Sequence, residues 1–274
     1  MVGGSSVDMG IKLAGQSIDG TRLAPPWHCG RQYIDSMLSH LSAWLSAQVP
    51  SQCLVCRRWP AQPLCADCHG RFAHHPPRCS TCALVLAGSP TTDQCGACLR
   101  HPPPLTRCVA AVDYGYPWSL LITQWKFHTH PTLTRHLAAW LQQQPDWVGL
   151  RAQCSLTLPI PLSSQRLRQR GYQQALLLAQ ALDCPGIQAD GLLRTRDTSA
   201  QSRHNRAERL RNLRGAFAVA PKLQPRLHGQ AVLLVDDVIT TGATLHAAAH
   251  AVLAAGAASV HAVALARTPQ DAQR

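Results

Sequence analysis

The chain has 274 residues, enough for one large domain or two smaller ones, and no apolar run in it is long enough to cross a membrane. Its formal net charge is +12, and 23 of its 26 basic residues are arginine, whereas Glu208 is its single glutamate. This balance argues against a membrane-spanning protein and favours an anionic partner, either a phosphorylated small molecule or a nucleic acid. The N-terminus lacks a basic stretch followed by an apolar core, so we expect no signal peptide and a cytoplasmic protein.

The first part of the chain carries little sequence signal. Residues 1–32 are rich in glycine and serine without sustained periodicity, so we expect them to be disordered. A short amphipathic helix should follow, because apolar residues recur at helical spacing between Ile34 and Val49. We expect its apolar stripe to pack on the next domain. A membrane-surface role is the less favoured alternative, because the helix has no basic face.

Four Cys-x-x-Cys pairs follow, separated by 8, 10 and 12 residues. In a cytosolic chain such clustering indicates metal binding and not disulfides. Two pairs complete a tetrahedral four-sulfur site, so the sequence predicts two structural Zn²⁺ ions in a double zinc-ribbon module, which together with the preceding helix spans residues 33–104. Pairing in chain order is preferred, and a crossed arrangement stays open. The expected ligands are Cys53, Cys56, Cys65, Cys68, Cys79, Cys82, Cys95 and Cys98.

Strand and helix patterns alternate over residues 105–268. This alternation predicts an α/β domain with a doubly wound, mainly parallel sheet. We expect strands at 108–114, 155–159, 192–195, 216–220, 232–235 and 259–266, and helices at 119–127, 133–143, 172–182 and about 241–256.

Residues 231–245 carry the strongest functional signal. The buried strand at 232–235 is expected to end at two acids, Asp236 and Asp237, which would lie just outside its carboxyl end. A hydroxylic turn and a helix follow, and the turn N–H groups and the helix N-terminus together form a phosphate cradle. Paired carboxylates beside it suit ribose hydroxyls or a divalent cation. The cradle consists of Thr240, Thr241, Gly242, Ala243 and Thr244.

Two arginine-rich segments accompany this signal. Arg166, Arg168 and Arg170 fall on a loop or a first helical turn after the strand at 155–159, where guanidinium groups suit phosphate oxygens. Taken alone they could equally form a solvated basic face. Residues 194–214 form a long polar insertion with seven arginines and two acids, and long insertions in compact domains are usually functional.

The segment from Val232 to Thr244 resembles the phosphoribosyl-diphosphate (PRPP) signature of type I phosphoribosyltransferases at all thirteen positions. The resemblance implies that PRPP binds with Mg²⁺, with Asp236 and Asp237 on the ribose hydroxyls and Thr240 to Thr244 on the 5′-phosphate. It places the pyrophosphate on Arg166, Arg168 and Arg170. It also makes the insertion a mobile loop that closes over PRPP, with the residues Arg194, Arg196, Gln201, Arg206 and Arg209.

The cysteine pairs, Gln124-Trp-Lys-Phe127, the Pro-Ile-Pro strand end and Gly215-Ala-Phe217 together make residues 37–268 similar to the ComF/GntX family. That family joins a zinc module to a type I phosphoribosyltransferase domain and is linked to natural transformation and to the use of external DNA. The resemblance implies a phosphoribosyltransferase, of the pentosyl class of glycosyltransferases, and leaves the acceptor undefined.

Two alternatives stay open. The zinc module, the arginines and the aromatic residues Trp59, Phe72 and Tyr172 could hold single-stranded DNA without turnover, with PRPP as a regulatory ligand. A purely structural scaffold that docks on a helicase or a recombination mediator is the third reading.

Overall fold

The structure is a computed structural model. The chain divides into two compact parts, Met1–Pro50 and Ser51–Arg274, and all of the described residues belong to the second. The expected disordered segment at 1–32 and the expected helix between Ile34 and Val49 lie outside the described residues. The described residues are 52–59, 62–88, 92–127, 133–195 and 215–269.

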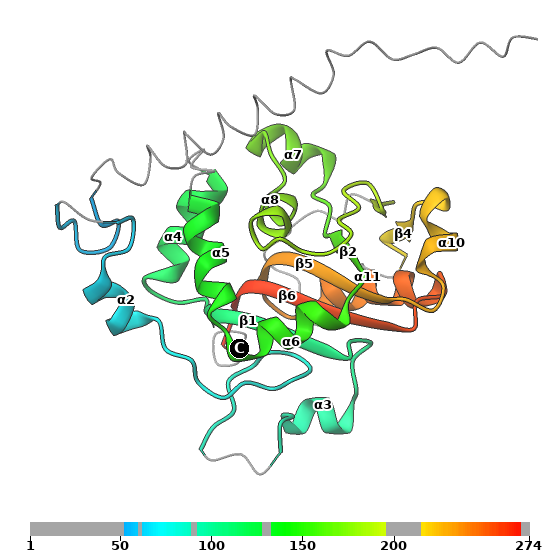
Figure 1. Cartoon of the computed structure of the whole chain (residues 1–274), viewed down its shortest axis with the longest axis horizontal. Helices are drawn as coiled ribbons and strands as arrows, with labels where there is room; N and C mark the ends of the chain where they lie inside the picture. Colours follow the sequence, from blue (N-terminus) through cyan, green and yellow to red (C-terminus); the bar gives the residue numbers. More distant parts are fainter. Residues whose placement is uncertain (1–51, 60–61, 89–91, 128–132, 196–214, 270–274) are drawn as a thin grey trace, which may run out of the picture. The chain divides into compact units, whose positions relative to one another are not determined.

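Four parallel strands form the central sheet, in the order β1-β6-β5-β2 (Figure 1). Val232 to Val235 in β5 have no exposed surface, as expected of a strand that is covered on both faces. A second, two-stranded sheet pairs β3 with β4 antiparallel. The predicted α/β class with a mainly parallel sheet is confirmed. The strands are β1 (Arg107–Asp113), β2 (Leu156–Pro159), β3 (Leu192–Arg194), β4 (Phe217–Val219), β5 (Ala231–Ile239) and β6 (Ser259–Arg267).

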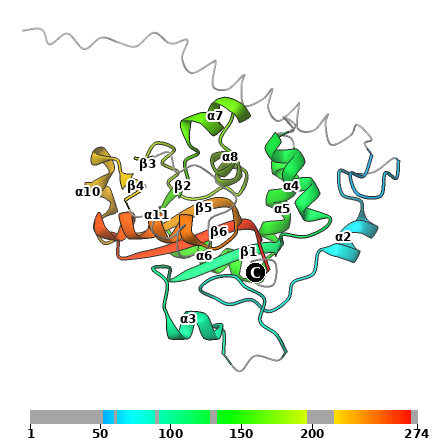
Figure 2. The same ribbon diagram turned by 180° about the vertical axis from the view of Figure 1, so that it is seen from behind.

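Helices cover both faces of the central sheet, so the molecule has two apolar cores. One core contains residues of α4 (Trp118–Phe127), α5 (Leu133–Gln142), α6 (Pro145–Gln153) and α8 (Gln174–Ala181). The other contains residues of α11 (Ala243–Ala254), of the β3–β4 sheet, of the 3-10 turn Pro221–Leu223 and of α10 (Gln224–Leu227). Helix α6 lies in front of the sheet in Figure 1, and α11 lies in front of it in the reverse view of Figure 2. No helix among the described residues is long and apolar enough to cross a membrane.

The cysteine-rich segment forms two small units, each ending in a short helix that begins after a cysteine, α2 (Ala66–Phe72) and α3 (Gly96–Arg100). The first unit contributes Cys53 and Leu64 to the core that contains α4 and α5. The second contributes Ala83 to the core that contains α11. The N–H of Cys108 in β1 donates to the carbonyl of Ser80 at 2.7 Å, so the second unit lies along the outer edge of β1. The two units therefore contact different parts of the larger domain.

One expectation about β5 is wrong. We expected the strand to end at Val235, with the two acids just outside it, but β5 continues through Asp236 and Asp237 to Ile239. The cause is its neighbour β6, which pairs with it as far as Ile239↔Arg267. Strand β2 stops earlier, at Pro159↔Val235. The acids therefore lie within a strand that has one paired edge and one free edge.

Helices α6 and α7 are among those that the sequence analysis did not predict. Helix α6 offers only Trp147 and Leu150 as buried residues, too few to reveal a period. Helix α7 (Ser164–Arg170) has no buried residue, so it has no apolar stripe at all. Its ends carry the signals instead, because the Ser163 side chain accepts the N–H of Arg166 at 3.3 Å and Gly171 has a φ of 76°.

The turn before β3 provides a test of the fold. Gly186 has a φ of 53°, and a Cβ atom there would collide with the carbonyl oxygen of Ser155. We expect Gly186→Ala to lower the free energy of unfolding by about 2–3 kcal/mol, through backbone strain and the collision. Gly149→Ala is the control, because nothing lies within 4 Å of a Cβ atom there and the residue is in α6. Urea denaturation measures both; equal stabilities for the two variants would contradict the described turn.

Candidate functional site

Asp237 is the centre of a charged cluster at the carboxyl end of β5. Its Oδ1 lies 2.8 Å from Lys126 Nζ of α4, and its Oδ2 lies 3.7 Å from Arg170 Nη1 of α7. The three side chains are only 9–15% exposed. Ion pairs that are shielded from water in this way are much stronger than surface pairs. The cluster therefore brings two helices to the same carboxylate.

Lys126 is a site residue that the sequence analysis missed. It lies in Gln124-Trp-Lys-Phe127, which supported the family resemblance without a role of its own. The end of α4 is held firmly, because the Tyr172 hydroxyl donates to the carbonyl of Trp125 and the Trp125 indole donates to Thr134 Oγ1 at 2.9 Å. The available signal was composition, since Lys126 is one of only three lysines in an arginine-rich chain.

Arg170 differs from the two other arginines predicted on the pyrophosphate side. Its guanidinium stacks over the Phe127 ring at 4.9 Å and donates to Gln174 Oε1 at 3.1 Å. Burial lowers the pKa of this guanidinium below the ordinary arginine value, and the Asp237 carboxylate opposes that effect. Arg166 and Arg168 lie on the same helix and are exposed to solvent. The structure thus brings one of the three arginines to the acids and leaves two on the open side of α7.

Asp236 has a different environment from Asp237. Its Oδ1 accepts the N–H of Asp237 at 2.8 Å. The pKa of its carboxyl is raised to about 7, chiefly by burial and next by the charge of Asp237, while the Asp237 N–H, Lys126 and Arg194 act in the opposite direction. Two adjacent acids with unequal surroundings can differ in protonation near neutral pH. Such a pair can present one carboxylate and one carboxyl to a diol.

The turn after β5 has the geometry of an anion site. Gly242 has a φ of 83° and forms the N-cap of α11, and a Cβ atom there would lie 3.2 Å from the His246 ring. Thr241 Oγ1 accepts the N–H of Ala243 at 3.3 Å. The first N–H groups of an α-helix have no acceptor within the helix, and the helix dipole makes this end positive. The turn at 240–244 can therefore bind a phosphate.

The predicted loop residues are only partly described. Arg194, at the end of β3, lies with its guanidinium 5.4 Å from the Phe217 ring and donates to the Pro161 carbonyl at 3.5 Å. This places it beside the chain that leads from β2 to α7. The other four predicted loop residues lie outside the described residues, namely Arg196, Gln201, Arg206 and Arg209.

The eight cysteines form two groups in chain order, Cys53, Cys56, Cys65 and Cys68 in the first and Cys79, Cys82, Cys95 and Cys98 in the second. Within each group the ligand atoms lie within 4.8 Å of one another; the sulfur atoms of Cys56 and Cys65 are 3.6 Å apart, and those of Cys82 and Cys95 are 3.7 Å apart. A tetrahedral Zn²⁺ with Zn–S bonds of about 2.3 Å holds its sulfur atoms about 3.8 Å apart. Both groups therefore fit a four-sulfur metal site, and the crossed pairing is not observed.

Backbone N–H groups also favour thiolates in these groups. The N–H of Cys65 donates to Cys53 Sγ at 3.5 Å, and that of Cys95 donates to Cys79 Sγ at 3.3 Å. The pKa of Cys79 is lowered to about 4, chiefly by its hydrogen bond with Cys82, although burial acts in the opposite direction. Because metals bind the thiolate form, this arrangement suits a metal that needs four sulfur ligands.

Comparison with known proteins adds a family context. Residues 168–274 match the phosphoribosyl transferase domain, a range that contains the turn and both acids. The chain is 36% identical over 231 residues to the DNA utilization protein YhgH of Salmonella typhi, a match that covers 80% of this chain and 98% of that protein. It is 32% identical over 205 residues to competence protein F of Haemophilus influenzae, covering 71% and 87% of the two chains. Competence protein ComFC of Bacillus subtilis is 39% identical over 112 residues, covering 40% and 44%.

The raised pKa of Asp236 predicts a pH-dependent stability. A carboxyl whose folded pKa of about 7 exceeds the ordinary 3.8 stabilises the fold below pH 4, and this contribution is lost as the pH rises through 7. We expect Asp236→Asn to raise Tm more at pH 8 than at pH 5, by about 5–10 °C, because a folded pKa of about 7 changes the stability by about 2–3 kcal/mol between these pH values and about 1 kcal/mol shifts Tm by about 2–4 °C in a chain of this size. Calorimetry at both pH values measures it. The control is Asp146→Asn, at a side chain that is 67% exposed. A change in Tm for Asp236→Asn that is the same at pH 5 and pH 8 would refute the raised pKa.

Proposed function

Because the chain belongs to the ComF/GntX family, with a phosphoribosyl transferase domain, we propose that it binds PRPP with Mg²⁺ and transfers the phosphoribosyl group with release of pyrophosphate. We propose further that it does so in the use of external DNA or in competence, the processes that the names of its relatives give. One observation carries the proposal: the ion-paired Asp237 lies on β5, three residues before the phosphate-binding turn that follows this strand.

The two ends of PRPP fit different chemistry in the site. The 5′-phosphate would lie on the turn at 240–244, where helix N–H groups and hydroxyls converge. The ribose diol would donate to Asp236 and Asp237. The pyrophosphate would lie against Arg170 and Lys126, which already lie beside Asp237. Arg166 and Arg168, which are exposed to solvent, would approach it from the open side of α7.

The ion pairs suggest how ligand binding begins. In the described state Lys126 and Arg170 neutralise Asp237 and leave it unavailable to a diol. A pyrophosphate group carries more negative charge than one carboxylate and competes for both cations. The carboxylate would then be released toward the ribose at the same time as the pyrophosphate is bound. Binding of the pyrophosphate group to this cluster would thus make the Asp237 carboxylate available to the ribose of the same ligand.

The chemistry needs electrostatic stabilisation and no protein nucleophile. The C1–O bond to pyrophosphate breaks and C1 forms a bond to a nucleophilic atom of the acceptor, which gives up its proton. In the transition state negative charge grows on the leaving pyrophosphate and positive charge grows on the ribose ring. Lys126 and Arg170 are placed to stabilise the first charge, and the carboxylates of β5 are placed to stabilise the second. Mg²⁺ bound with PRPP would add charge neutralisation at the leaving group.

Two substitutions separate these roles. We expect Asp237→Asn to weaken PRPP binding by tenfold to a hundredfold, since hydrogen bonds to a charged group contribute about 1.5–3 kcal/mol. The same variant should bind pyrophosphate alone at least as tightly as the wild type, because Lys126 and Arg170 lose their competing carboxylate. Lys126→Met should weaken both ligands. Calorimetry with Mg²⁺ measures the affinities, with Asp146→Ala as the control; unchanged PRPP binding by Asp237→Asn would contradict the proposal.

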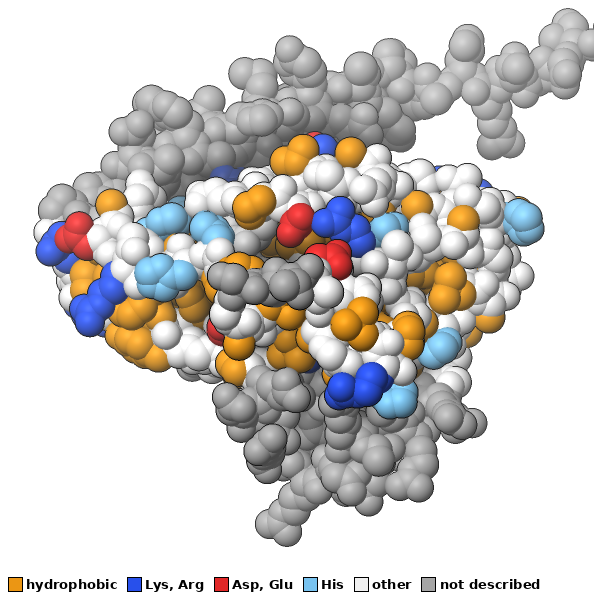
Figure 3. All heavy atoms as spheres, turned by 90° about the horizontal axis from the view of Figure 1, so that it is seen from below, with side chains coloured by type: hydrophobic (Ala, Val, Ile, Leu, Met, Phe, Trp, Pro, Cys, Tyr) orange, Lys and Arg blue, Asp and Glu red, His pale blue; other side chains and the backbone are white. Residues whose placement is uncertain are grey.

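A second candidate function is binding of single-stranded DNA, which the net charge of +12 and the names of the relatives favour. The structure corrects the expected stacking residues. Phe72 is half-buried and packs edge-on against Tyr116 at 5.7 Å, and Tyr172 is half-buried and anchored to α4, which leaves Trp59 as the exposed one of the three. On the face shown in Figure 3 the basic side chains lie in separate small groups among acidic and apolar ones. The described residues of this face therefore form no continuous basic track for a nucleic acid.

The DNA reading makes its own prediction. Binding to oligo-dT should weaken by about 10³-fold or more between 50 and 200 mM salt if six or more phosphates are contacted. Trp59→Ala should cost a further 1–3 kcal/mol, roughly the contribution of one stacked base. Fluorescence anisotropy measures both effects, and salt-independent or undetectable binding would exclude this function.

A further inference from the structure

We propose that Arg267, at the end of β6, is a positioning residue that couples the second cysteine group to the phosphate-binding turn. Under this proposal, occupancy of the second metal site sets the affinity for the 5′-phosphate, whereas the first metal site does not. The inference rests on the proposed function for the identity of the ligand. Its structural half, the link between the metal site and the turn, can be tested without any ligand.

Arg267 is a charged residue in an almost completely buried position, with 4% of its surface exposed. Its Nε donates to the carbonyl of Cys82 at 3.0 Å. Its Nη1 donates to the carbonyl of Ile239, the last residue of β5, at 3.0 Å. The same atom also donates to the carbonyl of Thr240, the first residue of the turn. A guanidinium suits this place because it donates from a rigid fork and accepts nothing.

The contacts orient the turn. In a trans peptide the C=O of one residue and the N–H of the next point in opposite directions. Anchoring the Thr240 carbonyl on Arg267 therefore directs the N–H of Thr241 away from the guanidinium. The left-handed Gly242 then carries the chain into α11. Arg267 thereby helps to select the peptide orientation in which the turn offers its N–H groups to an anion.

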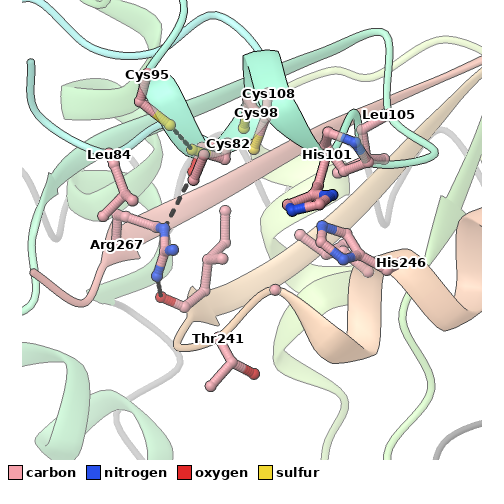
Figure 4. Close-up of a pocket in the computed structure, with 15 residues that line it drawn as sticks. Cys82, Leu84, Cys95, Cys98, His101, Leu105, Cys108, Thr241, His246 and Arg267 are labelled. Atoms are coloured by element: carbon pink, nitrogen blue, oxygen red, sulfur yellow. Dashed lines mark hydrogen bonds between the residues drawn. The ribbon is translucent and has the colours of Figure 1, made fainter. Parts of the chain in front are cut away.

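The space beside Arg267 shows why this link matters. A cavity of about 250 Å³ separates the second cysteine group from the start of α11. In Figure 4, His101 and His246 face each other on one side of this space, and Arg267 reaches from β6 toward Cys82 on the other. The second cysteine unit contributes Ala83 to the core that contains α11, and beside the cavity the hydrogen bonds of the guanidinium add a direct polar link from Cys82 to the end of β5.

The anchor at Cys82 depends on the shape of the metal-binding knuckle. The N–H of Ala83 donates to the Cys79 carbonyl at 2.8 Å, and Ala83 has a φ of 59°, an unusual value for a residue with a Cβ atom. Arg78 holds the same knuckle from the other side, donating to the Ala83 carbonyl at 3.1 Å and to Asp113 Oδ1 at 2.8 Å. A metal on the four thiolates would hold this strained knuckle in place. Without it, the Cys82 carbonyl loses its fixed position.

The first cysteine group is attached elsewhere and so provides the matched control. It packs in the core with α4 and α5, and the Trp118 indole donates to the Phe72 carbonyl at 3.1 Å. Loss of metal there should disturb α4 and leave the turn at 240–244 as it is.

The test compares Cys95→Ser with Cys56→Ser in the full-length, zinc-loaded protein. Hydrogen exchange of the backbone amides at 239–245 should speed up in Cys95→Ser and stay at the wild-type rate in Cys56→Ser. Arg267→Lys, which keeps the charge and loses the fork, should reproduce the faster exchange while two zinc ions remain bound. Equal exchange at the turn in Cys95→Ser and Cys56→Ser, or wild-type exchange in Arg267→Lys, would overturn the link.

Ligand binding supplies the second readout. We expect Arg267→Lys to weaken ribose 5-phosphate binding by roughly tenfold, the loss of one charge-assisted hydrogen-bond anchor, and to leave pyrophosphate binding unchanged. Equal weakening of both ligands would mean a general loss of structure and would overturn the positioning role. If the wild type binds neither ligand, the proposed function fails, and the exchange data still decide on the coupling.

Discussion

The site depends on a difference in length between two neighbouring parallel strands. Strand β5 stays paired with β6 through Ile239, whereas β2 leaves it at Val235. This difference opens one edge of β5 where its two acids lie, and the ends of α4 and α7 supply Lys126 and Arg170 to that edge. A carboxylate shielded from water needs such cations, and a pyrophosphate needs them as well. The resting structure and the proposed ligand therefore compete for the same groups.

The cysteine-rich module does more than fold its own small segment, because it also contacts the larger domain. Its two units attach to opposite cores of the larger domain, the first beside α4 and the second beside α11 and the ends of β1 and β6. Each unit thus supports one half of the charged site: the first contacts α4, the helix with Lys126, and the second is linked to the phosphate-binding turn through Arg267. The two units can in this way stabilise both halves.

Much of the fold was predictable because apolar periodicity carries it. Strands β1, β2 and β6 and the helices α4, α5 and α11 begin and end within about two residues of their predicted bounds, and β5 begins within one residue of its predicted start. The cysteine spacing likewise predicted the two metal groups in chain order. Helix α7 escaped because it buries nothing, and the extension of β5 escaped because acids rarely continue a buried strand. The role of Lys126 could not be predicted either, since only the packing of α4 brings it to a residue 111 positions away.

A crystal structure of the zinc-loaded protein with PRPP and Mg²⁺ would show which residues hold each group of the ligand. We expect the 5′-phosphate on the N–H groups of residues 241–244, the ribose diol on Asp236 and Asp237, and the pyrophosphate against Lys126 and Arg170, with the Lys126–Asp237 ion pair broken. PRPP bound elsewhere, or bound at the turn while Asp237 keeps both of its cations, would contradict it.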